Sequence, residues 1–349
     1  MTIASRVLAR AVLLGLGVAP LAPLARVAPL GAQGYHVART VVLGGDGGWD
    51  YVALDTVGHR LFIARQDRVM VVDPASGKVL AEIPGLNRAH GIAFSYETGR
   101  GFATSGADSA VTIFDLASLR VVGHTTVAPD DDAILYDPVT KRIVTFNGDA
   151  HSASVLNPAS GKRIGTIELG GGPEFGVSAG DGKLYVNLED KAAVAEIDAT
   201  AMKVTRQWSL APCEAPTGLA IDRAHHRLFS GCRNQLMAIS DATTGKLVTT
   251  VPIGQGVDAC RFDAGTGLAF ASNGDGTLTV VHEDTPDKFT VVGNVPTKRG
   301  ARTMELDERS HRLFTVTADF GPPPAPTPER PRPRPSILPG TFALLVLEP

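Results

Sequence analysis

The stretch RLFIARQDRVMVVDPASGKVLAEIPG, residues Arg60–Gly85, contains three short apolar runs separated by turn residues. Because β-branched and aromatic residues favour strands while Asp, Pro and Gly favour turns, the stretch predicts three consecutive antiparallel strands. The run YVALD, which ends at Asp55, precedes it and supplies a fourth strand. This four-strand unit is the basis of the fold prediction.

The same unit recurs along the whole chain. Aligned on the first run of each copy, seven units start at intervals of 40, 42, 42, 43, 41 and 44 residues. A steady period near this length, with four strands per repeat, is typical of a β-propeller. The seventh unit lacks its fourth strand, and an unassigned strand-like run, Tyr35–Gly44, precedes the first unit. We therefore predict an all-β, seven-bladed β-propeller of four-stranded antiparallel blades, in which Tyr35–Gly44 pairs with Thr341–Glu348 to complete the last blade.

The N-terminal residues differ from the repeats. Arg6 and Arg10 precede an apolar run, Ala11–Ala25, and small residues follow up to Ala32. This pattern predicts a cleaved secretory signal peptide over residues 1–32, and the run is too short for a membrane span. We expect a periplasmic or secreted monomer with one mature domain, residues 35–349. The net charge of −3 offers no basic surface for nucleic acid.

The repeats also resemble a known family. The opening stretch and Lys183–Val204, KLYVNLEDKAAVAEIDATAMKV, share an aromatic-rich strand, a variable loop, the pattern V-x-V-x-D or a close variant of it, and a tight turn. In these features the chain is similar to the YVTN-type repeats of YncE-like β-propellers. The strict YVTN motif is absent, and YVNL around Tyr185 comes nearest to it. The resemblance implies an exported seven-bladed propeller of a family often without an assigned activity.

The two faces of such a propeller are predicted to differ. The strands are lettered a to d from the centre outward. The a–b and c–d turns share one face and have a uniform, Asp-rich sequence pattern. The aspartates that we interpret as turn formers on that face are Asp55, Asp73, Asp137, Asp222 and Asp307. The histidines of the same turns are interpreted as exposed residues, because they are spread around the rim and cannot bind one metal ion together. They are His59, His225, His226 and His311. The b–c and d–a loops vary, so we expect function on their face.

Strand a is innermost, so the residues at its start are predicted to form a ring at the channel mouth. The ring members are Asp50, His90, Asp132, Glu174, Thr217, Asp258 and Arg302. One interpretation is that the ring has no specific function and is polar only because water fills the channel mouth. Arg302 lies between Asp258 and Asp50 in the ring order, which predicts an ion-pair triad.

The arc formed by His90, Asp132 and Glu174 predicts a different site. Neighbouring carboxylates repel one another, so a raised pKa, a bound cation or a cationic ligand should compensate them. Oxygen-rich side chains on nearby loops could add ligands suited to Ca²⁺ or Mg²⁺: Asn147, Glu189, Asp190 and Asn273.

Three aromatic side chains near the ring allow two interpretations. Trp49, Tyr51 and Phe175 could line the mouth beside the carboxylates, or they could fill contacts between blades. Deeper in strand a, Arg261 and Glu305 occupy equivalent positions in adjacent blades whose counterparts are apolar. This pair predicts a salt bridge between blades 6 and 7.

The cysteines and a proline-rich segment complete the predicted functional face. Cys213 and Cys232 lie on loops of one blade at this face, which predicts a disulfide, and Cys260 should be a buried free thiol inside a strand. The segment 321–340 is interpreted first as a surface loop. It could also form a partial lid over the ring or dock a partner.

Three functions remain open at this level. The first is a non-enzymatic binding protein that takes a small polar or cationic ligand, or a protein partner, through the channel-mouth ring and Trp49. The second is a lactonase-like, metal-dependent hydrolase that uses Asp132 and Glu174, with His90, around a divalent cation. A quinoprotein-like or copper redox subunit is the least supported, because His90 is the only histidine in the ring. No catalytic residue or firm cofactor follows from the sequence.

Overall fold

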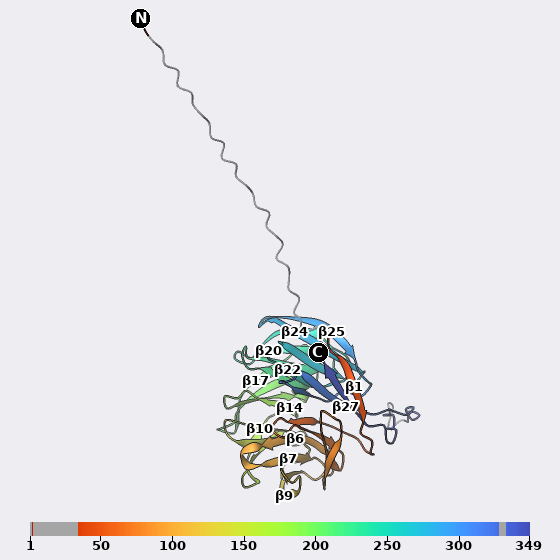
Figure 1. The fold of residues 1–349 in the computed structure, drawn as a ribbon. Coiled ribbons are helices and arrows are strands. Elements are labelled where there is room, and N and C mark those ends of the chain that lie inside the picture. The colour runs from red at the N-terminus through yellow and green to blue at the C-terminus, as the bar shows by residue number, and fades with distance from the viewer. Residues whose placement is uncertain (1, 3–33, 328–332) are drawn as a thin grey trace. The chain divides into compact units, whose positions relative to one another are not determined.

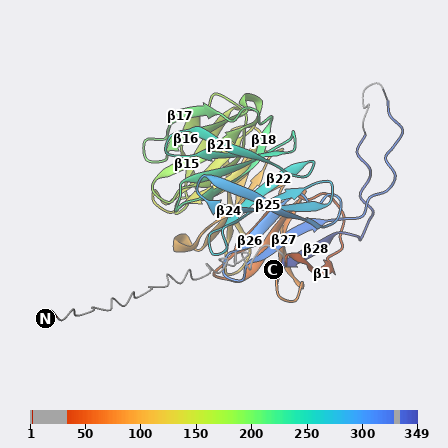
Figure 2. The same cartoon turned by 90° about the horizontal axis from the view of Figure 1, so that it is seen from above.

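The structure is a computed structural model that describes residue 2, residues 34–327 and residues 333–349. Seven four-stranded antiparallel sheets are arranged in a ring (Figure 1, Figure 2), which confirms the predicted seven-bladed β-propeller. Apart from residue 2, the predicted signal peptide lies outside the described residues. Among the described residues, no helix has the length and apolarity needed to cross a lipid bilayer.

Each blade follows the strand order of the predicted repeat. The strands of blades 1 to 4 are β2 (Val52–Asp55), β3 (Arg60–Arg65), β4 (Arg68–Val72), β5 (Val79–Pro84); β6 (Ala89–Ser95), β7 (Arg100–Ser105), β8 (Ala110–Asp115), β9 (Val121–Thr126); β10 (Asp131–Asp137), β11 (Arg142–Asn147), β12 (Ser152–Asn157), β13 (Lys162–Glu168); β14 (Pro173–Ser178), β15 (Lys183–Leu188), β16 (Ala193–Asp198) and β17 (Lys203–Ser209). Those of blades 5 to 7 are β18 (Pro216–Asp222), β19 (Arg227–Cys232), β20 (Leu236–Asp241), β21 (Lys246–Pro252); β22 (Val257–Asp263), β23 (Leu268–Asn273), β24 (Thr277–Thr285), β25 (Lys288–Pro296); β26 (Met304–Asp307), β27 (Arg312–Thr317), β28 (Ala343–Glu348) and β1 (His36–Val42). Two short 3-10 turns, Tyr96–Thr98 and Glu189–Lys191, are the described helical elements.

The ring closes as the sequence predicts. Strand β1 pairs antiparallel with β28, so that His36 lies opposite Glu348 and Val42 lies opposite Ala343. The N-terminal strand therefore supplies the outer strand of blade 7, and the hydrogen bonds of β28 are completed on both sides.

Apolar side chains fill the spaces between neighbouring blades. Phe62 of blade 1 and Phe114 of blade 2 are fully buried, with ring centroids 5.7 Å apart. Burying a side chain of this size stabilises the fold by about 1.5–3 kcal/mol. Seven such clusters of buried residues occur in the described chain, and most of them join two blades.

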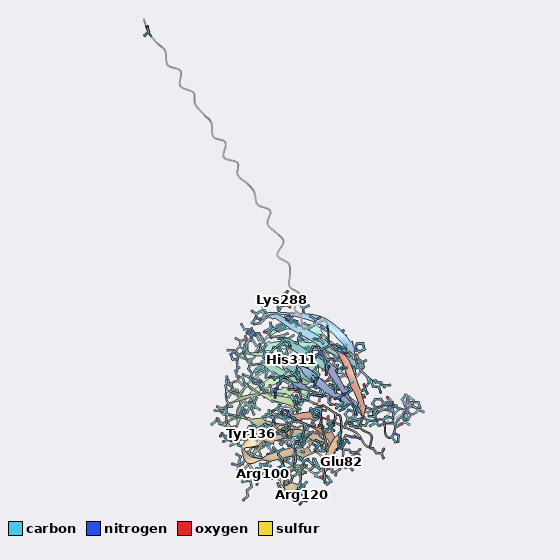
Figure 3. All side chains as sticks on the ribbon, in the orientation of Figure 1. Glu82, Arg100, Arg120, Tyr136, Lys288 and His311 are labelled. Carbon is cyan, nitrogen blue, oxygen red and sulfur yellow. A yellow bond between two sulfur atoms is a disulfide. The ribbon has the colours of Figure 1, made fainter. Side chains whose placement is uncertain are left out.

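The uniform turns hold the opposite face together. Each of the five aspartates predicted to form turns accepts backbone N–H groups of its own turn, as predicted. Arginines at the start of strand b then reach the next blade. The Arg100 guanidinium donates to the carbonyl oxygens of Pro158 and Ala159, at 3.0 and 2.7 Å. Figure 3 labels the Arg100 side chain. Arg142 makes the same contact with Ala199 one blade further on.

Candidate ligand site at the channel mouth

The backbone is irregular where the predicted ring begins. In blades 2 to 6 the pairing of strands a and b shifts register close to the ring residue, for example between Asp131 and Ile134 around Asp132. A β-bulge leaves one residue unpaired and redirects its side chain. Strands β2 and β26 begin after Asp50 and Arg302, so these two ring residues precede their strands. The ring residues are thus outside the regular ladder in all seven blades.

Side chains of strand b satisfy the backbone groups that these irregularities free. The Thr104 hydroxyl donates to the carbonyl oxygen of Asp132 in the next blade at 2.6 Å. The amide of Asn187 donates to the carbonyl oxygens of Thr217 and Gly218, and Ser272 donates to that of Arg302. Because each bond crosses from one blade to the next, the neighbouring blade fixes the ring backbone.

The structure brings Asp50, His90 and Asp132 together. Nδ1 of His90 is hydrogen-bonded to Oδ2 of Asp50 and lies 3.1 Å from Oδ1 of Asp132. A single N–H can serve one acceptor well, and Oδ1 of Asp132 has no hydrogen-bond donor among the described residues. Nε2 of His90 is also buried without a partner there, beside Gly106.

Burial and charge together determine protonation in this group. Burial by itself lowers the pKa of His90, but the hydrogen bond to Asp50 and the charges of Asp132 and Asp50 raise it overall. Burial, together with the charge of Asp50, raises the pKa of Asp132 to about 7. The buried carboxyl of neighbouring Asp131 has its pKa raised to about 7 by burial, and it accepts the N–H of Ser105.

Glu174 lies in an acidic pocket on the other side of Asp132. The cavity has a volume of about 430 Å³ and opens on the face of the b–c and d–a loops. Its titratable lining residues are Asp130, Asp132, Asp149, His151, Glu174, Glu189 and Asp190. Burial, a hydrogen bond with the Glu189 carboxyl and the charge of Asp132 raise the pKa of Glu174 to about 9. The shift keeps the Glu174 carboxyl protonated at neutral pH.

Arg302 makes half of the predicted triad. Its Nη1 lies 3.4 Å from Oδ1 of Asp258, whereas Asp50 turns to His90 in the other direction around the ring. Burial raises the pKa of Asp258 to about 6, although the charge of Arg302 opposes the shift. Thr217, the remaining ring member, is buried, and its hydroxyl donates to the carbonyl oxygen of Val257.

The glycine-rich entry loop is organised by Arg65, which the sequence analysis did not single out. The fully buried guanidinium donates to the carbonyl oxygens of Gly48 and Asp46, at 3.0 and 2.9 Å. It also lies 3.6 Å from the ring centroid of Phe342. Burial lowers the pKa of Arg65 to about 10. The loop thus folds around a cation, and this arrangement positions Asp50.

Two aromatic rings from the starts of strands a contact each other beside the acidic residues. Tyr51 of blade 1 and Phe175 of blade 4 meet with centroids 5.5 Å apart. Beneath them, Arg261 pairs with Glu305 at 2.9 Å, as predicted, and lies 4.9 Å from the Phe175 centroid. Trp49 packs against Phe342, with a centroid distance of 5.4 Å. Tyr51 and Phe175 thus contact each other although they come from blades 1 and 4, which are not neighbours in the ring.

Two of the four additional oxygen ligands are turned away from the pocket. Asn147 and Asn273 are fully buried, and each amide is bonded to hydroxyl groups of its own blade. Glu189 and Asp190 do line the pocket. Strand alternation explains the difference, because the asparagines end strand b whereas the acids lie on the following turn.

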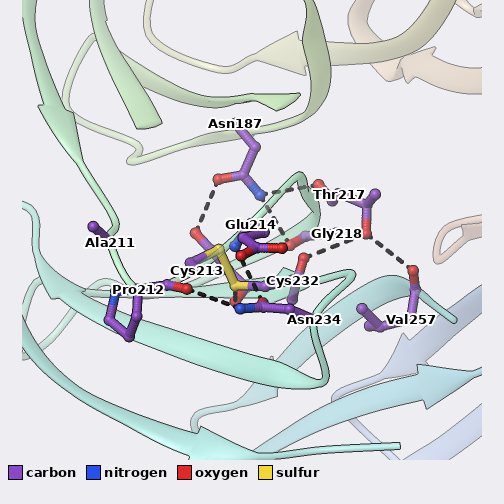
Figure 4. The surroundings of a disulfide bond; sticks show 12 residues. Asn187, Ala211, Pro212, Cys213, Glu214, Thr217, Gly218, Cys232, Asn234 and Val257 are labelled. Atoms are coloured by element: carbon purple, nitrogen blue, oxygen red, sulfur yellow. Dashed lines mark hydrogen bonds between the residues drawn. A yellow bond between two sulfur atoms is a disulfide. The ribbon is translucent and has the colours of Figure 1, made fainter. Parts of the chain in front are cut away.

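The predicted disulfide is present beside the ring. Cys213 and Cys232 are bonded, with their Cα atoms 5.5 Å apart (Figure 4). Asn234 donates to the carbonyl oxygen of Pro212 and thereby holds the same entry loop. Cys260 is a buried free thiol, as predicted, and burial raises its pKa to about 12. A disulfide is typical of an oxidising compartment.

The described ends of the proline-rich segment are anchored at the rim. Phe320 and Ile337 form an isolated bridge, and Phe320 lies 6.1 Å from Trp49. The charge of Arg334 acts on Asp258 in the ring. The described parts of the segment project outward from blade 7 in Figure 2. This path fits the surface-loop interpretation best.

Comparisons with known proteins support the fold. No protein-family profile matches the sequence, and no curated protein matches it significantly. The chain is similar to the solved structure of U3-55K, with a TM-score of 0.74 and 10% identity over 89% of this chain and 99% of that one. It is similar to the RRP9 WD40 repeats, with a TM-score of 0.75 and 11% identity over 90% and 99%. It is also similar to a chain of the Mitotic Checkpoint Complex, with a TM-score of 0.70 and 14% identity over 99% of each chain. At these identities the likeness shows the β-propeller fold.

Proposed function

We propose that this protein is an exported binding protein that holds a small organic cation in the acidic pocket at the channel mouth. The observation that carries the proposal is the cavity of about 430 Å³, which six carboxyl groups line and in which Glu174 holds a proton at neutral pH. A pocket of that volume is within the range used for small molecules. An ammonium group placed there would replace the proton and relieve the repulsion among the carboxylates.

The charge distribution favours this part of the ring over the rest. His90 already faces both Asp50 and Asp132, and Arg302 already faces Asp258. Within the pocket, His151 is the only lining residue that can carry a positive charge among those described. Three lining acids pair with cations at the pocket rim, namely Asp130 with Arg88, Glu189 with Arg233 and Asp190 with Lys191. Glu174 has no ion pair among the described residues, so a ligand cation would be bound most strongly there.

Export rests on separate observations. The disulfide is typical of an oxidising compartment, and the YVTN-type resemblance implies a secreted or periplasmic propeller. The signal-peptide pattern in residues 1–32 agrees with both.

Calorimetric titration of the purified protein with putrescine tests the proposal. The wild type should bind the diamine, and Glu174→Gln should weaken binding by at least about tenfold, because one charge-assisted contact is lost. Glu214→Gln is the matched control, since Glu214 is exposed on the same face and outside the pocket lining. No binding by the wild type, or an equal loss in the control, would contradict the proposal.

A metal-dependent hydrolase is the second candidate. Three potential ligand atoms lie within 4.8 Å of one another, one each from Asp50, His90 and Asp132. A divalent cation such as Ca²⁺ or Mg²⁺ could bridge that spacing. Metal analysis of the purified protein and a panel of lactones and esters test this candidate. Asp132→Ala should abolish both metal content and turnover if it is right, and a wild type without either property excludes it.

A further inference from the structure

A second convergence of metal-ligating atoms lies on the opposite face, between blades 5 and 6. Asp222 ends β18, His225 lies in the following turn, and Glu283 lies near the end of β24. Nδ1 of His225 is 2.7 Å from Oδ2 of Asp222 and 2.8 Å from Oε1 of Glu283. The sequence analysis interpreted His225 as a simple exposed turn residue, but its ring nitrogen faces two carboxylates.

Glu283 is unusual when it is compared with the same position in other blades. By strand register it corresponds to Leu116, Ala199 and Ala242, whose backbone N–H groups make the same bond to the residue before strand b. In blade 6 the c–d hairpin is longer, because β24 runs to Thr285. Blade 6 thus has a carboxylate at a position where these blades have a buried apolar side chain.

The carboxylate of Glu283 is instead directed at Asp222 and His225. Its side chain is only 4% exposed, yet neither oxygen has a well-directed hydrogen bond from the described residues. A buried carboxylate without donors is costly unless a cation compensates it. This orphaned group is evidence for a ligand that is independent of the clustering itself.

The nearest buried cation is already used elsewhere. Arg227 donates to the carbonyl oxygens of Pro286 and His225, and it pairs with Asp241 and Asp287 at 3.0 Å each. These contacts account for all three nitrogens of its guanidinium. Arg227 attracts Glu283 at longer range but gives it no hydrogen bond.

We propose that Asp222, His225 and Glu283 form a binding site for a divalent transition-metal ion of the Zn²⁺ class, which joins blades 5 and 6 on the face opposite the channel mouth. One imidazole nitrogen and two carboxylates suit Zn²⁺ better than Ca²⁺, which prefers six to eight oxygen ligands. Two carboxylates and a neutral imidazole also balance the ion's charge.

The geometry needs a small adjustment. Tetrahedral Zn²⁺, with bonds of about 2.0–2.2 Å, separates neighbouring ligand atoms by about 3.4 Å. The His225 ring must therefore move out by about 0.6 Å relative to the present contacts. Its side chain is 51% exposed on a turn, so it is free to make this movement. Three protein ligands leave a fourth position for water.

Calorimetric titration with Zn²⁺ and visible spectroscopy with Co²⁺ test the site. The wild type should bind one equivalent of Zn²⁺. Both Glu283→Gln and His225→Ala should weaken Zn²⁺ binding by at least tenfold, and both should lose the absorption bands of tetrahedral Co²⁺. Because His225 is exposed, His225→Ala should fold normally and serves as the second variant if Glu283→Gln does not. Saturating Zn²⁺ should raise the Tm of the wild type and leave that of His225→Ala unchanged.

Two controls separate this site from its surroundings. His226→Asn changes the adjacent exposed histidine, which has a positive φ of 55° that asparagine tolerates, and should keep the equivalent. Asp132→Asn alters the channel mouth and should also keep the Zn²⁺ equivalent. The metal test therefore remains valid even if the proposed function at the channel mouth is wrong. Unchanged Zn²⁺ binding in His225→Ala, or equal loss in His226→Asn, would overturn the proposal.

Discussion

Replacing Glu174 by glutamine should make the free energy of unfolding less dependent on pH. Burial and the Glu189 carboxyl raise the pKa of Glu174 from 4.5 to about 9 in the folded protein. Between these two values the folded state holds a proton that the unfolded state has lost. The contribution of this carboxyl to stability is therefore fully present below pH 4.5 and is lost as pH rises through about 9. Glutamine keeps the shape of the protonated group and cannot ionise.

The size of the effect follows from the shift. Each pH unit within the window removes about 1.4 kcal/mol of wild-type stability, which gives roughly 6 kcal/mol over the whole range. Water in the open pocket screens the charge of the ionised carboxylate. We therefore expect about half of that value, roughly 3 kcal/mol, between pH 5 and pH 9.

Urea denaturation at each pH from 5 to 9 measures the difference. Wild type and Glu174→Gln should have similar free energies of unfolding at pH 5, and the variant should be increasingly the more stable of the two towards pH 9. Glu214→Gln, which changes an exposed carboxylate on the same face, should follow the wild type. Parallel profiles for all three proteins would refute the electrostatic reasoning.

Four further predictions concern the framework of the site. Serine at both Cys213 and Cys232 should lower the free energy of unfolding by about 3 kcal/mol, because the bridge spans a sequence separation of 19; an unchanged urea midpoint would be inconsistent with this. Cys260 should react with iodoacetamide only after denaturation, since it is buried, and mass spectrometry of the native protein should show no label. Leucine at Arg65 should destabilise the protein by about 2–4 kcal/mol and accelerate hydrogen exchange in the glycine-rich loop, because buried carbonyl oxygens lose their donor; slow exchange there would disprove the role. Alanine at Gly218 should cost about 1–3 kcal/mol, because its Cβ would lie 2.6 Å from the backbone nitrogen of Cys260, and a wild-type Tm would show that the strands can separate freely.

The fold was predictable because its signal is repeated. Seven copies of one strand pattern identify the repeat even where a single copy is ambiguous, and a missing last strand implies the closure that β1 makes with β28. The cross-blade pair of Arg261 and Glu305 was also visible, because the equivalent positions of the other blades are apolar. Comparison between repeats thus revealed departures from the pattern.

The candidate site was predictable only in outline. The repeat gives the order of residues around the ring but not their side-chain directions, so the pairing of Asp50 with His90 rather than Arg302 could not be foreseen. The bulges that redirect the ring residues depend on cross-blade bonds such as that from Thr104 to Asp132. Glu283 could have been noticed as a glutamate where other repeats have an apolar residue, such as Leu116, Ala199 or Ala242.

The pairing of β1 with β28 constrains the order of events during biosynthesis. Strand β1 is synthesised some three hundred residues before β28, so its hydrogen bonds to β28 can form only after β28 has been made. Such a chain cannot finish folding while its C-terminal end is still being made. Until synthesis ends, blade 7 lacks its outer strand, so closure of the ring is a late step of folding.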